Sequence, residues 1–223
     1  MKRRKVAILV LLLVLTGIGM FLLIARDSTV DDAFIADEAI GDAAFAAWVA
    51  DNTHAILSAS GAERTRAIVT SCRMKARVVE ADEREAGQRA LLNLGHTFAH
   101  AIEACAGYSG KVLHGEAVAA GCCLAFDLSA QLGLAPAEDA TRVRTWFAQA
   151  GLPASFADLP ELGASEDDLI EIMRQDKKAS GGKLVLVLAR GVGRAFVARD
   201  VDEGAVRTLL RTALAQGSSP KRS

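Results

Sequence analysis

The chain has 223 residues, of which 51% are hydrophobic, and its formal net charge is −1. This is enough apolar material for one well-packed domain, and the near-neutral charge argues against a nucleic-acid-binding protein. The four cysteines include no CxxC pair and two are adjacent, so the sequence indicates a reducing compartment rather than a disulfide-stapled secreted domain.

The first 26 residues differ in kind from the rest. The basic cluster MKRRK precedes an uncharged run from Val6 to Ala25, which as a helix spans about 30 Å, the thickness of a bilayer core. A cleaved signal has a shorter apolar region and a small-residue cleavage site, which LIARDS lacks. We therefore predict a signal anchor over residues 1–26 that crosses the membrane with residues 6–25. The basic flank predicts a cytoplasmic N-terminus, with the remainder outside.

After an acidic juncture at residues 27–39, the hydrophobic periodicity predicts a mainly helical domain over residues 40–216, followed by a polar tail at 217–223. Helices are expected at about residues 42–52, 62–80, 91–103, 114–133, 137–150, 165–178 and 203–215. A glycine turn inside a β-rich stretch predicts one hairpin over residues 183–201. The fold class is therefore mainly α with one short β element.

Three of the predicted helices carry details that a structure can test. Phe45 and Trp48 are three residues apart and should share one face of the first helix. Ser165 and Asp168 have the spacing of a capping box. In the helix at 62–80, the sequence predicts an inward stripe through Ile68, Cys72, Lys75 and Val79.

Three of the four histidines fall within nineteen residues. On a helix, His96, His100 and Glu103 share one face, and His114 begins the next helix, from which it can fold back. Two imidazoles from different elements plus a carboxylate oxygen would form a zinc site, although no HExxH protease motif is present. The alternative is that the histidines are hydrogen-bonded parts of a core.

Cationic and amide side chains precede and follow the histidines. Arg89 and Asn93 precede His96 by seven and three residues, so both can lie on the histidine face. Lys75, Lys177 and Lys178 would add positive charge. Such a lining suits a substrate with phosphate and carboxylate groups. The alternatives are a Lys75 stem lying along the core and a lysine pair that complements a helix C-terminus.

Two stretches carry a family resemblance. MKARVVEADEREAGQRALLNLGHTFAHAIEACAGYSGKVLHGEAVAAG closely resembles the 3-dehydroquinate synthases, and MRQDKKASGGKLVLVLARGVG resembles the same family further on. The resemblance covers residues from about Ala39 to the C-terminus and implies the helical C-terminal domain of that fold. Related sugar phosphate cyclases share much of the pattern.

The resemblance implies a lyase of the shikimate pathway that uses NAD and zinc (or cobalt). Such an enzyme converts 3-deoxy-D-arabino-heptulosonate 7-phosphate into 3-dehydroquinate and phosphate. By resemblance, the metal ligands are His96 and His114. The catalytic residues are His100, Lys75 and Glu85. The substrate-binding residues are Arg89, Asn93, Lys177 and Lys178.

Two departures from the family pattern limit the expected activity. No glycine-rich turn follows a strand, so we expect no NAD site in this chain and a separate nucleotide-binding chain as partner. The family's glutamate ligand falls near Ala33, where Asp31, Asp32 and Glu38 are the nearest acids. We therefore expect weak zinc binding and no turnover by this chain alone.

Other interpretations stay open at this point. The chain could be an inactive truncated or fused remnant, a membrane-anchored metal- and anion-binding module, or a related cyclase, and a homodimer is also open. The anchor and its charges predict an exported domain, whereas the cysteines and the family chemistry indicate the cytoplasm.

Overall fold

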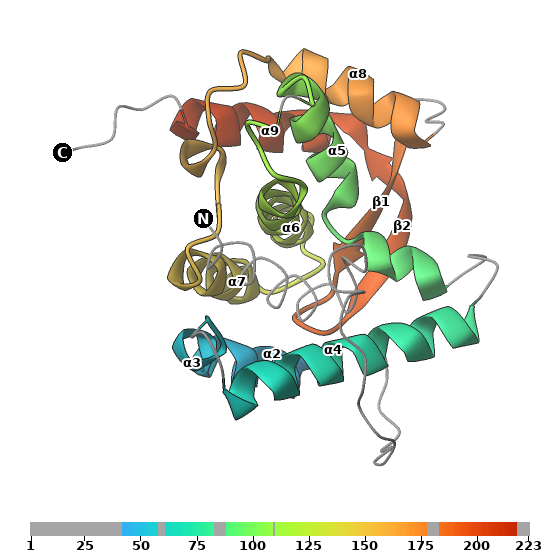
Figure 1. Ribbon diagram of the computed structural model, residues 1–223. Helices are drawn as coiled ribbons and strands as arrows, with labels where there is room; N and C mark the ends of the chain where they lie inside the picture. Colours follow the sequence, from blue (N-terminus) through green and yellow to red (C-terminus); the bar gives the residue numbers. More distant parts are fainter. Residues whose placement is uncertain (1–41, 58–60, 83–87, 109, 178–182, 218–223) are drawn as a thin grey trace.

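The computed structural model describes residues 42–57, 61–82, 88–108, 110–177 and 183–217. The elements in chain order are α2 (Ala43–Asp51), α3 (Thr53–Leu57), α4 (Ala62–Ala81), the 3₁₀ helix η1 (Gln88–Asn93), α5 (His96–Cys105), α6 (His114–Gln131), α7 (Ala137–Gln149), the 3₁₀ helix η2 (Phe156–Asp158), α8 (Glu166–Lys177), β1 (Lys183–Ala189), β2 (Ala195–Asp202) and α9 (Glu203–Gly217) (Figure 1). The predicted mainly helical fold with one short hairpin is confirmed.

The predicted membrane span at residues 6–25 lies outside the described residues, as does the juncture at 27–39. In the part of the chain that the structure describes, no helix combines the length and the apolar character needed to cross a bilayer. Helix α3 and the 3₁₀ helix η2 are short elements that the hydrophobic periodicity did not predict, because one turn is too short to establish a period.

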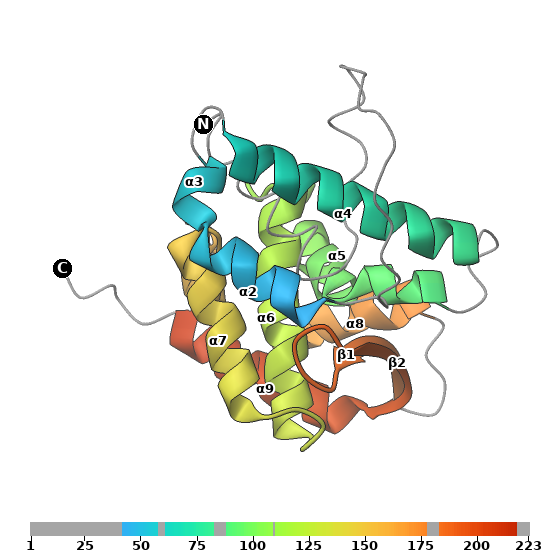
Figure 2. The ribbon, with the colours of Figure 1, turned by 90° about the horizontal axis from the view of Figure 1, so that it is seen from below.

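Helix α6 runs through the middle of the molecule, with α5, α7, α9 and the hairpin around it (Figures 1 and 2). Between Gly115 and Ser129, every residue except Glu116 and Asp127 is buried. The sequence explains this position, because the many alanines, glycines and cysteines of α6 let its neighbours approach closely. Each large side chain that α6 buries in the core, such as its own Phe126, contributes about 1.5–3 kcal/mol.

The hairpin packs one face against α6. Alternate residues of β1, namely Leu184, Leu186 and Leu188, are buried, as the period of a strand requires. Strand β2 pairs with β1 in antiparallel register, with one irregularity between Leu184 and Leu186. Ser129 on α6 fixes the end of β1, since its Oγ accepts a hydrogen bond from the Ala189 amide at 3.1 Å and donates to the Ala125 carbonyl at 2.6 Å.

Helices α8 and α9 are joined by ion pairs. Arg174 donates two hydrogen bonds of 2.8 Å to the two carboxylate oxygens of Glu203. Arg211 of α9 donates to Glu166 at 2.8 Å, and Arg207 pairs with Asp167. These contacts join α8 to α9 at both ends of α8, through Glu166 and Asp167 in its first turn and through Arg174 near its end.

The predicted capping box of α8 is confirmed. The Ser165 amide and hydroxyl both donate to Asp168 Oδ2, at 2.8 and 2.7 Å, and the Asp168 amide donates back to Ser165 Oγ at 3.3 Å. The shared face of α2 is also confirmed, since the rings of Phe45 and Trp48 stack 5.8 Å apart. The Arg66 guanidinium of α4 lies 4.2 Å from the Trp48 ring centroid and connects the two helices.

The predicted inward face of α4 is wrong by one residue. The fully inward positions are Ala67, Ser71 and Val78, whereas Cys72 is exposed. Both rows of side chains have the same helical spacing, so periodicity alone cannot separate them. The small side chains of Ala67 and Ser71 let the α4 backbone approach the core. A hydrophobicity pattern does not register side-chain size, so it cannot predict this close approach.

Candidate metal and anion site

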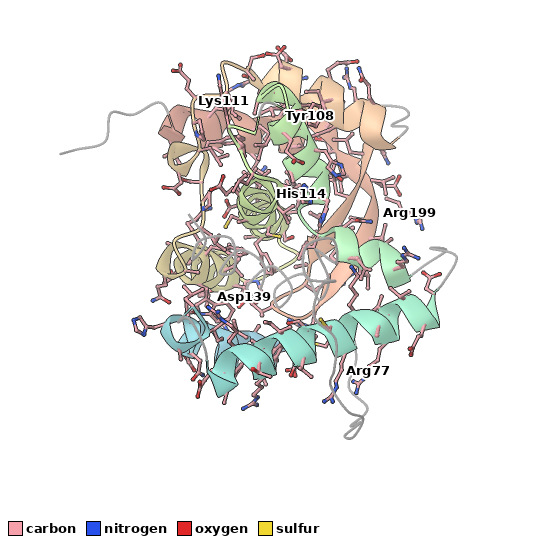
Figure 3. The ribbon with its side chains drawn as sticks, in the orientation of Figure 1. Arg77, Tyr108, Lys111, His114, Asp139 and Arg199 are labelled. Atoms are coloured by element: carbon pink, nitrogen blue, oxygen red, sulfur yellow. The ribbon has the colours of Figure 1, made fainter. Side chains whose placement is uncertain are left out.

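The three clustered histidines of the sequence lie together in the structure. The ring centroids of His96 and His114 are 5.7 Å apart, those of His96 and His100 are 6.0 Å apart, and those of His100 and His114 are 6.4 Å apart. His96 and His100 are half-buried on α5, while His114 is more exposed at the start of α6, beside α5 (Figure 3). The predicted convergence of imidazoles from two helices is therefore present.

The start of α5 is held in place by backbone geometry. Gly95, the residue before His96, has a left-handed conformation with φ of +79°, which favours glycine. The carbonyl of Leu94 accepts a hydrogen bond from Cys122 Sγ of α6 at 3.4 Å and lies 3.3 Å from His96 Nδ1. Burial raises the pKa of the Cys122 thiol well above its usual value, so the thiol stays protonated and remains a donor to Leu94.

The loop between α5 and α6 returns the chain toward the histidines. Gly107 and Tyr108 both have positive φ, +67° and +49°, and the Tyr108 side chain is 74% exposed. At the end of the loop, the Glu116 carboxylate accepts a hydrogen bond from the Leu113 amide at 3.0 Å, which satisfies an otherwise open donor at the helix start. His114 is thereby fixed as the first residue of α6.

A carboxylate of α5 contacts the ring of His114. Nδ1 of His114 lies 3.0 Å from Oε2 of Glu103. The Glu103 side chain is only 16% exposed, whereas that of His114 is 43% exposed. The carboxylate is thus screened from water while the imidazole keeps one open edge.

The donor chemistry of this cluster fits a zinc or cobalt ion through two imidazoles. Among the described residues, no group of three or more histidine, cysteine or acidic side chains is arranged to hold a metal. His96 and His114 would therefore supply two donors, and a third protein ligand would have to come from outside the described ranges. The nearby acids considered from the sequence, Asp31, Asp32 and Glu38, lie there.

Two cations act on each other near α4. Burial lowers the pKa of Lys75, and repulsion by Arg89 lowers it further, while Cys72 opposes the shift. Arg89 is held close to the end of α4 because its backbone amide donates to Asp82 Oδ2 at 3.0 Å. A bound anion would stabilise the charged form of a half-buried lysine that lies beside an arginine.

The helical face that we predicted for Arg89 and Asn93 is wrong in its geometry. Both residues belong to η1, which ends at Asn93, and the left-handed Gly95 separates it from α5. They therefore do not share the face of an α-helix with His96. The prediction failed because the spacing in LNLGHTFAH is compatible with one long helix, and a single glycine is a weak stop signal.

Several predicted site residues are not described. Glu85 and Lys178 lie outside the described residues, and α8 ends at Lys177, of whose side chain nothing is described. The contact of Glu103 with His114 and the role of Cys122 were not anticipated. Glu103 does share the histidine face of α5, so its spacing was the available signal, whereas nothing in the sequence points to the Cys122 contact.

Comparison with known proteins gives a consistent family. The model of the 3-dehydroquinate synthase C-terminal domain matches residues 34–179. A 3-dehydroquinate synthase from Ruegeria pomeroyi is 49% identical over 176 residues, which is 79% of this chain and 48% of the relative. A 3-dehydroquinate synthase from a Jannaschia species is 51% identical over the same shares. The chain thus spans about half the length of the curated relatives it matches.

Solved structures share the fold at low sequence identity. A 2-epi-5-epi-valiolone synthase from Streptomyces hygroscopicus subsp. jinggangensis, with NAD⁺ and Zn²⁺ bound, has a TM-score of 0.71 at 18% identity, covering 96% of this chain and 51% of that one. A 2-deoxy-scyllo-inosose synthase complexed with carbaglucose-6-phosphate, NAD⁺ and Co²⁺ has a TM-score of 0.66 at 19% identity, covering 94% and 52%.

Proposed function

The chain belongs to the 3-dehydroquinate synthase family, and we propose that its domain at residues 40–216 forms the metal- and anion-binding half of a sugar phosphate cyclase. The observation that carries this proposal is the approach of the His96 and His114 rings to 5.7 Å from two different helices. We assign the reaction as loss of phosphate from a heptulosonate phosphate with ring closure to 3-dehydroquinate.

His96 and His114 would hold a zinc or cobalt ion in this proposal. When bound, the ion would act as a Lewis acid on a substrate hydroxyl. His100 lies one turn after His96, with its ring 6.4 Å from that of His114, and we assign it to contact the substrate and to move a proton. Half-burial of His96 and His100 would limit the access of water to this reaction.

Lys75 and Arg89 would neutralise the phosphate and carboxylate groups of the substrate. Support comes from the lowered pKa of Lys75, which arises from burial and from Arg89 and which a bound anion would relieve. By family resemblance we also assign Asn93, Lys177 and Lys178 to substrate binding. Glu85 is assigned to catalysis on the same basis.

The described residues do not fit a dinucleotide. Their sheet is a two-stranded antiparallel hairpin, whereas NAD is bound at a parallel sheet with a glycine-rich turn before a helix. We therefore derive no redox step from these residues. Oxidation and reduction of the substrate would need a nucleotide-binding domain in addition to them.

The substrate class rests on the degree of similarity. The two curated 3-dehydroquinate synthases are 49% and 51% identical to this chain, whereas the two cyclases of solved structure are 18% and 19% identical. This difference favours the heptulosonate phosphate over the sugar phosphates of the related cyclases.

We also propose, from the uncharged run at residues 6–25 alone, that the protein is membrane-anchored. A reporter fused after Ser223 and membrane fractionation would test this proposal.

The test begins with metal and anion binding by the full-length protein in detergent. Zinc uptake is measured by competition with a chelating dye. Thermal stabilisation by 3-deoxy-D-arabino-heptulosonate 7-phosphate is then compared with that by inorganic phosphate. A ligand at a hundred times its Kd stabilises by about 2.7 kcal/mol, which is readily measured. His96→Ala and His114→Ala should abolish zinc uptake.

The matched control is His54→Ala, because His54 is the remaining histidine and lies exposed on α3. It should bind zinc as the wild type does. Turnover is assayed by phosphate release with NAD and zinc added, first with this chain alone and then together with the part of the Ruegeria 3-dehydroquinate synthase that this chain does not cover. A wild-type protein that takes up no zinc and gains no stability from the heptulosonate phosphate would refute the proposed function.

A further inference from the structure

We propose that Glu103 is a positioning residue that fixes the tautomer and orientation of the His114 imidazole. This inference rests on the proposed function, because it assigns to Glu103 a role in preparing the site for metal. The contact that carries it joins Glu103 Oε2 and His114 Nδ1 at 3.0 Å. It is made between α5 and α6, across the loop that separates the two helices.

The chemistry of the contact decides which ring nitrogen carries the proton. An ionised carboxylate only accepts hydrogen bonds, so His114 Nδ1 must be the donor. In the neutral ring, Nε2 then has the lone pair and is the nitrogen available to a metal. A carboxylate behind a metal-bound histidine also fixes the orientation of the ring.

His96 has the same arrangement with a different acceptor. Its Nδ1 lies 3.3 Å from the Leu94 carbonyl oxygen, which is also a group that only accepts. Both rings therefore keep their Nδ1 proton on the protein and leave Nε2 as the coordinating nitrogen. The two histidines come from different helices. The Leu94 carbonyl accepts the Nδ1 proton of His96, and the Glu103 carboxylate accepts that of His114.

The position of Glu103 distinguishes this contact from an ordinary surface ion pair. Its side chain is 16% exposed, so water competes weakly for the carboxylate. Glu103 is one turn after His100 on α5 and faces the same side. The left-handed residues Gly107 and Tyr108 reverse the chain, which brings His114 back onto Glu103 eleven residues later.

The experiment compares full-length wild type, Glu103→Ala, Glu103→Gln and Glu116→Gln in detergent. The last is a matched control: it removes one carboxylate charge at the same helix start, where the Glu116 carboxylate accepts a hydrogen bond from the Leu113 amide. Two-bond ¹H–¹⁵N NMR of the imidazoles, without metal, reports the tautomer of His114. Competition titrations measure the affinity for Co²⁺, and the visible spectrum of bound Co²⁺ reports its coordination. Circular dichroism verifies that each variant is folded.

We expect the Nδ1–H tautomer of His114 in the wild type and in Glu116→Gln, and its loss in Glu103→Ala. The affinity for Co²⁺ should fall about 10–100-fold in Glu103→Ala, the usual cost of losing such a partner. Glu103→Gln keeps an acceptor oxygen and should recover part of both signals. An unchanged tautomer in Glu103→Ala would overturn the inference.

Direct ligation by Glu103 gives a different pattern and would also overturn the inference. In that case Glu103→Gln would lose as much Co²⁺ affinity as Glu103→Ala, while the tautomer of His114 would not change. Failure of the proposed function is separable, since a wild-type protein that binds no Co²⁺ would refute the metal site. The tautomer measurement, made without metal, would still decide whether Glu103 positions His114.

Discussion

A Cβ atom on Gly121 would lie 2.2 Å from the carbonyl oxygen of Gly95. Helix α6 therefore meets the start of α5 with no side chain between the two backbones. In the opposite direction, a Cβ on Gly95 would lie 2.5 Å from the Cys122 amide nitrogen. Because α5 begins with His96 and α6 begins with His114, this glycine pair sets how closely the two candidate metal ligands approach.

Gly121→Ala should destabilise the protein by about 1–3 kcal/mol, the usual cost of overpacking, because the obstructing atom is backbone and cannot rotate away. Zinc affinity should fall as α5 and α6 separate. Denaturant unfolding and dye competition measure the two effects. Gly204→Ala is the control, since its Cβ would approach only the Asp202 carboxylate, and it should change stability little. A Gly121→Ala protein of wild-type stability would contradict the close approach.

Asp139→Ala should cost about 1–3 kcal/mol, because a buried donor loses its partner. Asp139 Oδ2 accepts a hydrogen bond from the Val192 amide in the hairpin turn at 3.2 Å, and its Oδ1 accepts from Arg142 at 2.5 Å. It thereby holds the turn between β1 and β2 against α7 (Figure 3). Glu138→Ala, at the exposed neighbouring position, should stay within about 0.5 kcal/mol of wild type. Equal losses in both variants would assign the effect to the helix start instead.

Lys75→Met should raise the Tm at neutral pH and weaken phosphate binding about 10–100-fold, as expected for losing a charged hydrogen bond. The pKa of Lys75 is lowered by burial and by Arg89, so the folded state disfavours its charge. Between that lowered pKa and the usual 10.5, the unfolded state binds more protons, and wild-type stability should rise with pH. The methionine variant should lack this rise.

The measurements for Lys75 are thermal unfolding from about pH 7 to pH 10 and phosphate titration of the metal-loaded protein. Lys183→Met, at an exposed position of β1, is the control and should leave phosphate affinity unchanged. Methionine keeps an apolar stem of similar length, so a lower Tm in Lys75→Met would show that the contacts of the ammonium group stabilise the fold by more than its burial and the repulsion by Arg89 cost.

Glu203→Gln should flatten the acid side of the stability curve. A hydrogen bond from Arg174 lowers the pKa of Glu203 below its usual 4.5. The stability from this pair is complete above the unfolded pKa and is lost as the pH falls through the lower folded pKa. Thermal unfolding between about pH 3 and pH 6 should therefore show a smaller decline in the variant. Asp200→Asn, which breaks the exposed pair with Lys183, is the control, and a decline as steep as wild type in Glu203→Gln would contradict the assignment.

Local signals in the sequence predicted most helices because they depend on neighbours in the chain. The capping box of Ser165 and Asp168 and the long apolar run of α6 are of this kind. The inward face of α4 could not be predicted, since two rows of side chains share the same spacing and only packing chooses between them. The break at Gly95 was missed for a related reason: the close approach of α6, which leaves no room for a Cβ at Gly95, is a contact with a distant part of the chain.

The candidate site also has features that the sequence predicts and features that it does not. The convergence of His96, His100 and His114 was predictable because helical spacing and a short loop bring them together. The acceptors behind the imidazoles were not, since a backbone carbonyl such as that of Leu94 leaves no trace in a residue pattern. The helical relation of Arg89 and Asn93 to the histidines failed because η1 and α5 are separate elements.

Tyr108 gives the protein a built-in reporter group. It is the only tyrosine in the chain, and this residue is 74% exposed in the loop between α5 and α6. Tyrosine-selective reagents, such as nitrating or iodinating agents, would therefore label one place in the molecule without any engineered change. The absorbance of a nitrated Tyr108 would then follow movements of this loop as ligands arrive, in the wild-type sequence.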